Sequence, residues 1–273
     1  MRKILLSLTT IGIVSALAFG LTSAFFSDTE TSTGNILQAG ELDLKIDNES
    51  YLNGVLNDNT TWTLDDLDDK LFFNFTDIKP SDLGEDTISF HAENNYWACM
   101  NISMTKNDDN TCTEPELLDD PTCTDPGSGQ GELAQNLNFV FWIDDGDNVL
   151  ENDENVFKEG TALSLFNGAI WTLADALTNL FEASGPLLGT ETYYIGKAWC
   201  FGTLTKTPLT QDGQGPNSPQ SPATNGGVSC DGSSLNNATQ TDIVTGDIQF
   251  NAYQSRNNPN FTCSGEQPSP TPT

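Results

Sequence analysis

Short windows in which apolar and polar residues alternate recur along the chain and constrain its fold more than any other feature. The clearest lie at 41–46, 71–75, 88–90, 96–104, 137–143, 192–201 and 247–253. Successive side chains of a β-strand point to opposite faces, so this alternation predicts strands with one buried face. Segments rich in Asn, Asp, Gly and Pro separate the windows, as in surface loops between strands. We therefore expect a mainly β protein, a jelly-roll-like two-sheet β-sandwich with loop and short-helix insertions.

Three segments interrupt the alternation. Residues 105–131 are acidic and contain two cysteines, which predicts a loop closed by a disulfide. Residues 152–184 contain short helical patches, which predicts a cap on one end of the sandwich. Residues 207–240 have the composition of a long exposed loop without a core of its own. The Pro- and Thr-rich tail at 264–273 predicts disorder or a stalk. The β domain is thus expected over 36–263.

The N-terminus has the pattern of a secretory signal peptide. Two basic residues precede an apolar run at 4–21, and Ala24 offers the small residue that a signal peptidase requires. Cleavage there would remove 1–24 and release a secreted or surface-located chain beginning at Phe25. The alternative is a retained anchor, because about 18 apolar residues approach the lower limit for spanning a bilayer. Membrane contact is expected only through an uncleaved leader.

The charge of the chain excludes one class of partner. The formal net charge is −29 at pH 7. A surface with this excess of carboxylates repels nucleic acid and anionic lipid. We expect no nucleic-acid partner.

The cysteines predict disulfides. Their number, six, is even, and the chain is expected to be exported. A zinc site is disfavoured because there is no Cys-x-x-Cys pair and the chain has one histidine. Six cysteines allow 15 pairings. Proximity in the sequence favours Cys112 with Cys123 and Cys200 with Cys230, which leaves Cys99 with Cys263.

Catalytic motifs are missing from the sequence. His91 stands alone and lacks the second histidine of a His-Glu-x-x-His zinc site, so we interpret it as a surface residue of a strand. There is no Gly-x-Ser-x-Gly elbow, phosphate-binding glycine loop or dinucleotide fingerprint. We expect no enzyme, and a secreted hydrolase using paired carboxylates is the least favoured class.

The densest group of candidate ligands is the stretch WIDDGDNVLENDENVF at 142–157. Calcium binds six to eight oxygen atoms, many of them from carboxylates near a turn. The spacing lacks the order of a 12-residue EF-hand loop, and a solvated acidic turn is the alternative in a chain with 39 carboxylates. Ca²⁺ is the one cofactor that the sequence suggests, and its candidate ligands are Asp144, Asp145, Asp147, Glu151, Asp153 and Glu154.

The new N-terminus would expose two aromatic residues, Phe25 and Phe26. Burying a phenylalanine is worth about 2 to 3 kcal/mol, so this end is expected to occupy a groove. The polar, Thr-rich residues that follow, 27–35, suit an extended segment that joins a sheet edge. The arm either folds back onto its own domain as an edge strand or enters a neighbouring subunit. Head-to-tail contacts of the second kind do not close and produce filaments.

Several motifs carry a resemblance to a known family. They are the leader residues 3–8, the Ala-Phe-Phe-Ser-Asp-Thr-Glu run within 24–35, the Ala-Gly-Glu-Leu-Asp-Leu segment at 39–44, and the turn at 78–84, in which Ser81 stands in place of the family's Gly. With these the chain resembles secreted proteins of the TasA and camelysin family, whose leaders are processed by a signal peptidase of the SipW type. The motifs cover about a fifth of the chain.

The resemblance implies a jelly-roll subunit of extracellular fibres, in a biofilm matrix or a surface pilus. In such fibres one subunit's N-terminal strand completes the next subunit's sheet, so the chain would form a homopolymer. The arm would span 25–35, and its donor strand would contain Phe25, Phe26, Ser27, Asp28, Thr29, Glu30 and Thr31. Metalloprotease activity described for some members is not carried over, because no zinc signature is present. The alternative is a monomeric secreted or surface-tethered domain that binds calcium or glycan.

Overall fold

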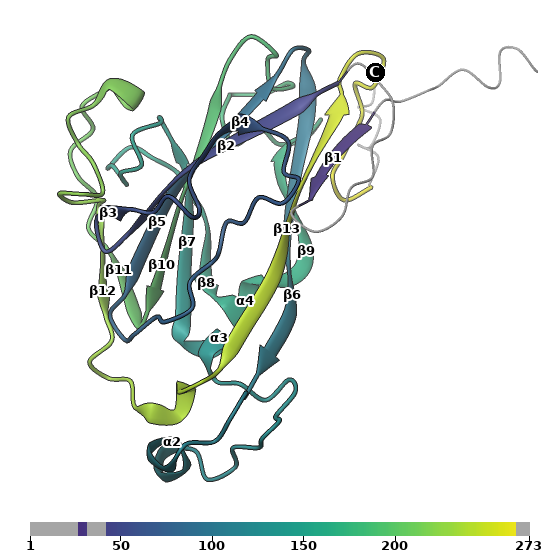
Figure 1. The fold of residues 1–273 in the computed structure, drawn as a ribbon. Helices are drawn as coiled ribbons and strands as arrows, with labels where there is room; N and C mark the ends of the chain where they lie inside the picture. Colours follow the sequence, from purple (N-terminus) through teal and green to yellow (C-terminus); the bar gives the residue numbers. More distant parts are fainter. Residues whose placement is uncertain (1–26, 32–41, 266–273) are drawn as a thin grey trace, which may run out of the picture.

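The structure is a computed structural model that describes residues 27–31 and 42–265. The predicted signal peptide, the aromatic pair Phe25 and Phe26, and most of the predicted tail lie outside these residues. The mainly β fold is confirmed, with antiparallel sheets and a few short helices (Figure 1).

The largest sheet has seven strands, all antiparallel to their neighbours. Six follow the order β3-β2-β5-β10-β7-β8, and β4 pairs with β2. Their bounds are β2 Leu44–Leu52, β3 Val55–Leu56, β4 Trp62–Asp65, β5 Leu83–Ala92, β7 Leu137–Asp144, β8 Val156–Thr161 and β10 Tyr193–Phe201.

A second sheet has four strands in the order β1-β13-β6-β9, and β11 and β12 form a small third sheet. The bounds are β1 Ser27–Thr31, β6 Tyr96–Asp108, β9 Asn167–Ala174, β11 Thr203–Lys206, β12 Val228–Asp231 and β13 Ile243–Gln254. The α-helices are α2 Glu114–Asp119, α3 Leu133–Asn136 and α4 Ala162–Leu165, and the 3-10 helices are η1 Gly215–Asn217 and η2 Asn237–Thr239.

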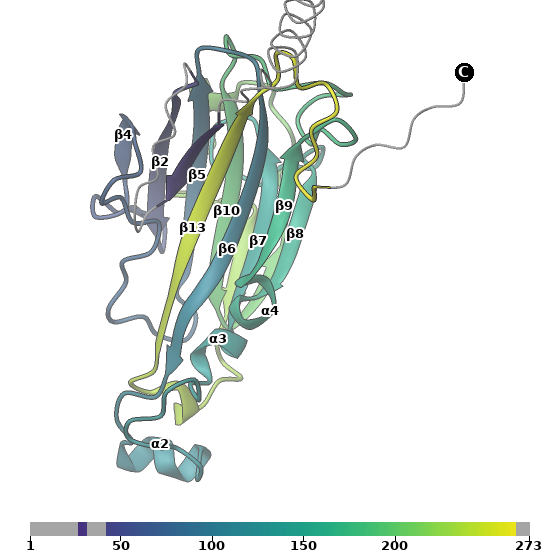
Figure 2. The ribbon, with the colours of Figure 1, turned by 90° about the vertical axis from the view of Figure 1, so that its right-hand side faces the viewer.

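Side chains from the two larger sheets meet in one hydrophobic core. The ring centroids of Phe90 on β5 and Phe250 on β13 lie 5.0 Å apart, so the two sheets are in direct contact. After a 90° turn of the molecule, β13 and β6 pass in front of β10 and β7 (Figure 2). Removal of this apolar surface from water is the main driving force for the fold.

The other face of the seven-stranded sheet is also covered. A smaller apolar cluster lies there, formed by Val140, Trp142, Leu150, Ala198 and Val228. Leu150 belongs to the loop after β7, and Val228 begins β12. Two loops, 145–155 and 207–227, therefore pack over this face of the sheet.

Three expectations for individual segments were wrong. The window 71–75 forms no strand, and Phe72, which the alternation places outward, is 2 % exposed. The segment 152–184 contains β8 and β9, which are edge strands with partly buried residues and therefore alternate weakly. The segment 207–240 contains β12, whose Val228 is buried because β12 packs against the outer face of the sheet.

Three disulfides brace the fold. They join Cys99 to Cys263, Cys112 to Cys123 and Cys200 to Cys230, the pairs that sequence proximity favours. The first ties β6 to the C-terminal segment, the second closes the loop that contains α2, and the third ties β10 to β12. Disulfides persist in oxidising compartments, so these three favour an extracellular environment.

Candidate functional site

Asp144, the last residue of β7, fixes the start of the acidic loop. Its side chain is 5 % exposed and shares the covered face of the sheet with Trp142, two residues before it. Trp142 Nε1 donates to Asp144 Oδ1 at 3.1 Å, and Thr87 Oγ1 of β5 donates to Oδ2 at 3.2 Å. The backbone amides of Gly146 and Asn148 donate to Oδ2 at 3.2 and 3.3 Å. These bonds hold the loop against β5.

Five of the six predicted ligand residues come together around this loop. Their ligand oxygens form two groups, each with its members within 4.8 Å of one another. The first group is Asp144, Asp145 and Asp147, and the second is Asp145, Glu151 and Glu154. Since both contain Asp145, the five carboxylates form one continuous acidic cluster. Asp153, the sixth predicted ligand, is exposed and belongs to neither group.

Glu154 holds the two ends of the cluster together. Its Oε1 accepts a hydrogen bond from the Asp145 amide at 3.0 Å, and its Oε2 accepts one from the Glu151 amide at 2.8 Å. The Asp147 side chain braces the turn between them, because its Oδ1 accepts from the Val149 amide at 2.9 Å. The loop conformation therefore depends on the same carboxylates that form the cluster.

The loop at 207–227 completes the cluster, and sequence reasoning missed its contribution. Glu151 Oε1 accepts from the Asp212 amide at 3.2 Å and from Gln220 Nε2 at 2.8 Å. The two loops also pair through their backbones, since the Leu150 amide donates to Gly226 O at 2.9 Å. The signal available in the sequence was the Gly226-Gly227 pair, which indicates a close approach of backbone.

Several buried oxygen atoms of this region have no hydrogen-bond partner in the described part of the chain. They are Asp145 Oδ1, Asp147 Oδ2, Asn148 Oδ1 and Glu151 Oε2. Asn148 and Glu151 are each 1 % exposed, so these oxygens have little access to bulk water. A buried polar atom without a partner is costly, and oxygens of this kind are the ligands that a calcium ion binds.

A pocket opens beside the cluster. It has a volume of about 350 Å³, and its lining includes Asp47, Glu49, Asp147, Asn148, Tyr194 and Ser218. Its walls therefore carry acidic and hydroxyl groups from the strands and from both loops. This pocket gives solvent and ions a path to Asp147.

Burial raises the pKa of the cluster's carboxyl groups. Burial, with the charge of Asp147 adding to it, raises the pKa of Asp144 to about 7. Burial and the charge of Asp144 raise the pKa of Glu154 to about 9, and burial raises that of Asp147 to about 6. No Lys or Arg within the described ranges forms an ion pair with these groups. Protons or a cation must therefore neutralise part of the charge.

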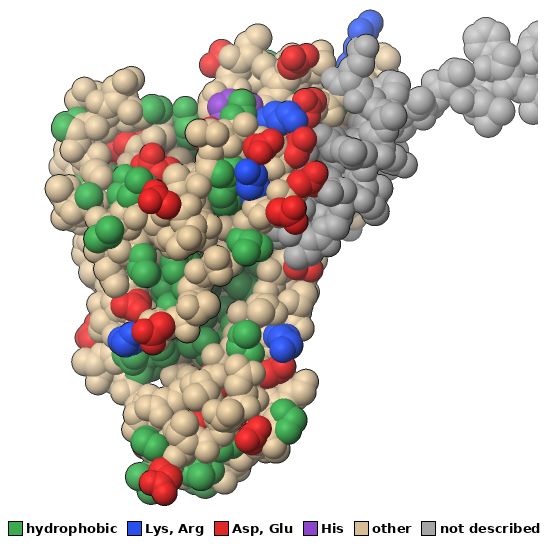
Figure 3. Space-filling model, in the orientation of Figure 1, with side chains coloured by type: hydrophobic (Ala, Val, Ile, Leu, Met, Phe, Trp, Pro, Cys, Tyr) green, Lys and Arg blue, Asp and Glu red, His purple; other side chains and the backbone are tan. Residues whose placement is uncertain are grey.

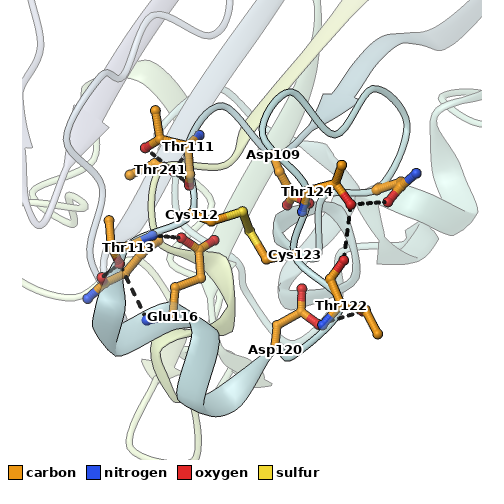
Figure 4. The surroundings of a disulfide bond; sticks show 12 residues. Asp109, Thr111, Cys112, Thr113, Glu116, Asp120, Thr122, Cys123, Thr124 and Thr241 are labelled. Carbon is orange, nitrogen blue, oxygen red and sulfur yellow. Dashed lines mark hydrogen bonds between the residues drawn. A yellow bond between two sulfur atoms is a disulfide. The ribbon is translucent and has the colours of Figure 1, made fainter.

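Figure 4 shows the loop closed by Cys112 and Cys123. Thr113 caps the N-terminus of α2 in a capping box with Glu116: the Thr113 amide donates to Glu116 Oε2 at 3.0 Å, and the Glu116 amide donates to Thr113 Oγ1 at 3.3 Å. Asp109, Glu116 and Cys123 lie close enough to hold a metal ion. Because the Cys123 sulfur is bonded to Cys112, it cannot serve as a thiolate ligand.

A second acidic group lies at the start of α3, outside the predicted site. Asp242 Oδ2 accepts from the backbone amides of Glu132 and Leu133 at 2.7 and 2.9 Å. Burial and a hydrogen bond to Asp109 raise the pKa of Asp242 to about 7. Asp242 thus satisfies free amides of a helix N-terminus, which is a structural role.

The described part of the predicted donor strand, Ser27–Thr31, forms β1. It pairs antiparallel with β13 of the same chain, from Ser27 opposite Tyr253 to Thr31 opposite Gln249. The isolated chain therefore adopts the fold-back alternative for this segment. β1 has β13 as its one neighbour in the sheet and lies at the sheet's edge (Figure 1).

His91 lies on β5 and is not part of the acidic cluster. Its Nε2 is 3.4 Å from Asp47 Oδ2 and 3.0 Å from Ser89 Oγ. The metal-ligand groups found among the described residues do not include it.

Acidic side chains are scattered over the face of the molecule seen in Figure 3 and are mixed with apolar ones.

Comparisons with known proteins found no matching family model, no matching curated protein and no matching solved structure. Among the residues that the structure describes, no helix is long and apolar enough to cross a membrane.

Proposed function

We propose that this protein is a secreted structural subunit of extracellular fibres, in a biofilm matrix or a surface pilus, whose copies join by exchanging β1. The observation that best supports this proposal is the position of β1, a strand of five residues that lies at a sheet edge and has one neighbouring strand. Pairing of this kind is made of backbone hydrogen bonds, which β13 of another copy can supply equally well. Exchange of identical elements is a low-cost route to assembly.

The edge of β13 can accept the strand of another copy. β13 is 12 residues long, and β1 pairs with the five residues 249–253. If β1 left, these residues would become an open edge with free N–H and C=O groups, which pairs readily with another strand. An arm from a second copy would restore the pairing, and repetition of this contact extends a filament. The N-terminal motifs quoted above for the TasA and camelysin resemblance also support this proposal.

The finer architecture belongs to the same proposal. We assign the two larger sheets to a two-sheet β-sandwich of jelly-roll-like topology. Support comes from their shared core and from the contact between Phe90 and Phe250 across it. In such a sandwich β1 lies at the edge of its sheet.

Calcium binding is the second candidate function. We propose that Ca²⁺ binds the acidic cluster and locks the loops 145–155 and 207–227 onto the outer face of the sheet. The specific support is the set of buried oxygens without partners beside carboxylates that no Lys or Arg neutralises in the described residues. The ion would hold the subunit in the rigid form that a fibre needs. A monomeric calcium-binding domain is the alternative function.

Electron microscopy of the purified secreted protein tests the fibre proposal. We expect filaments from the wild type and none from a variant lacking residues 25–31. The control lacks residues 266–273, a deletion of similar length near the other end of the sequence, and should form filaments. The proposal fails if the wild type stays dispersed, or if the variant without 25–31 still forms the same filaments.

A further inference from the structure

Lys197 and Asp86 form a close pair inside the core. They lie directly opposite each other on β10 and β5. Both side chains are 0 % exposed, and Lys197 Nζ lies 2.8 Å from Asp86 Oδ2. Apart from this contact, neither atom has a hydrogen-bond partner among the described residues. The pair is separate from the acidic cluster, since Lys197 occupies the core face of β10 between Ile195 and Trp199.

An ion pair explains this arrangement poorly. Two charges removed from water are stabilised only when the geometry is good and further hydrogen bonds satisfy the remaining donors and acceptors. Lys197 Nζ lacks such bonds and lies instead 4.0 Å from the ring centroid of Phe73 and 5.9 Å from that of Phe72. Burial lowers the pKa of Lys197 against the opposing effect of the Asp86 charge, which favours the neutral amine. A neutral amine is a nucleophile.

Asn48 on β2 positions and polarises the Asp86 carboxyl group. Asn48 Nδ2 donates to Asp86 Oδ1 at 3.2 Å and to the Thr60 carbonyl oxygen at 2.6 Å. The second bond fixes the amide so that its N–H points at Oδ1. A donor at this place stabilises negative charge that develops on Oδ1 during attack at the carboxyl carbon. Asn48 is 1 % exposed, so the interaction occurs away from bulk water.

We propose that Lys197 and Asp86 join in an intramolecular amide bond that links β10 to β5. The ammonium of Lys197 first passes a proton to the Asp86 carboxylate, which gives a neutral amine and a carboxylic acid. The Nζ lone pair then attacks Cγ, and the C–O bond to the protonated oxygen breaks. That oxygen leaves as water with a second proton from Nζ. One N–C bond forms, one C–O bond breaks, one water is released, and no oxidant or reductant takes part.

The surroundings favour this reaction. The reacting groups are held in contact before it begins, which removes most of the entropic cost of bringing them together. The Phe72 ring, which is 2 % exposed, helps to close the site against water. Once the released water leaves, hydrolysis of the amide would require water to return to a site lined by apolar groups. The bond would form in a single chain and does not depend on assembly into fibres.

Mass spectrometry of the secreted protein, after reduction of its disulfides, tests the proposal. Once the N-terminal residue is determined, we expect an intact mass lower than that of the sequence by one water. Proteolysis should release a branched peptide that joins a segment of β5 to a segment of β10 at Asp86 and Lys197. An unchanged mass with separate peptides overturns the proposal. So does a loss of one ammonia with Asn48 in the branched peptide, because Asn48 would then be the acceptor.

A Lys197→Met variant supplies the control. Methionine has a similar length but no amine, so its intact mass should equal that of its sequence. Ring closure at an Asp-Gly step, such as Asp145-Gly146, also releases water, but it would persist in this variant. Loss of water in both proteins therefore overturns the proposal. The peptide analysis of the wild type stands even if the variant fails to fold.

Discussion

Asp145 and Asp147 are the residues on which the proposed calcium site depends most. Asp145 is shared by both groups of ligand oxygens, and Asp147 has a buried oxygen without a hydrogen-bond partner in the described part of the chain. Both lie on the loop that leaves β7, so a cation bound there would join the two halves of the cluster. Changing either residue should therefore affect the metal-free and the calcium-bound protein differently.

Asp147→Asn should abolish most of the stabilisation by calcium. For the wild type, a calcium concentration 100 times the dissociation constant should stabilise the fold by about 2.7 kcal/mol. Without calcium the variant should be at least as stable as the wild type, because it removes one of several mutually repelling charges. Thermal melts with calcium and with a chelator measure both effects. Asp153→Asn, which changes an exposed residue outside the cluster, should keep the full calcium response; equal responses of all three proteins would remove the site.

The stability of the calcium-free protein should fall as the pH rises. The pKa values of Asp144 and Glu154 are raised to about 7 and about 9, whereas unfolded Asp and Glu titrate near pH 4. Between about pH 4 and pH 9 the folded protein thus binds more protons than the unfolded chain, and stability is lost across that window. With calcium present, the stability should instead rise with pH, because the carboxyl groups must lose their protons to bind the ion. Denaturant unfolding at several pH values measures this, and a rise of calcium-free stability through the window would contradict the account.

The two loops over the seven-stranded sheet act as one element, and Gly227 is where they touch. Its φ is +75°, and a Cβ atom there would lie 2.2 Å from the Leu150 carbonyl oxygen. Any side chain at this position must push the loops apart. The 145–155 loop carries the cluster and the 207–227 loop donates hydrogen bonds to Glu151, so this contact links fold stability to calcium binding.

Gly227→Ala should therefore destabilise the protein and weaken its response to calcium. Gly129→Ala is the matched control, because Gly129 has a φ of +74° but an added Cβ would meet nothing within 4 Å. The control isolates the cost of a left-handed backbone, about 1 to 2 kcal/mol. Gly227→Ala should cost clearly more than that in denaturant unfolding. Equal losses, with the calcium response intact in both variants, would show that the loop contact is unimportant.

Elements with two neighbours were predictable from the sequence, and those at edges were less so. β7 and β10 lie inside the seven-stranded sheet and are buried along most of their length, so their apolar residues are dense enough to be recognised in the sequence. β8 and β9 are edge strands, each with one neighbouring strand, and their apolar and polar residues alternate only weakly. The window 71–75 alternates without forming a strand, because Phe72 is buried by tertiary contacts with Trp62 and Phe250.

The candidate site also contains residues that were predictable from the sequence and residues that were not. The five carboxylates were predictable because one short loop carries them all. Asp212 and Gln220 were not, because they reach Glu151 only through the fold, from more than 60 residues away in the sequence. The pairing of Lys197 with Asp86 was not predictable either, because only the register of β5 and β10 brings these two residues together.

The whole molecule combines a braced core with β1, the one strand that we propose to detach. Disulfides tie β6 to the C-terminal segment and β10 to β12, whereas β1 is held by the pairing of five residues. The proposed amide bond would add a covalent link inside the seven-stranded sheet. In the proposed fibre, such a subunit would exchange β1 while the rest of the fold stays intact.

Cysteine crosslinking between two variants tests this exchange most directly. Thr29 of β1 lies opposite Asn251 of β13, and the described residues contain no free cysteine. When Thr29→Cys protein is mixed with Asn251→Cys protein under assembly and then oxidised, we expect disulfide-linked heterodimers. Thr29→Cys mixed with Leu118→Cys, on exposed α2 far from β1, should give none (Figure 1). If the mixed chains stay separate while a Thr29→Cys/Asn251→Cys double variant closes its bridge within one chain, β1 does not exchange and the fibre account is wrong.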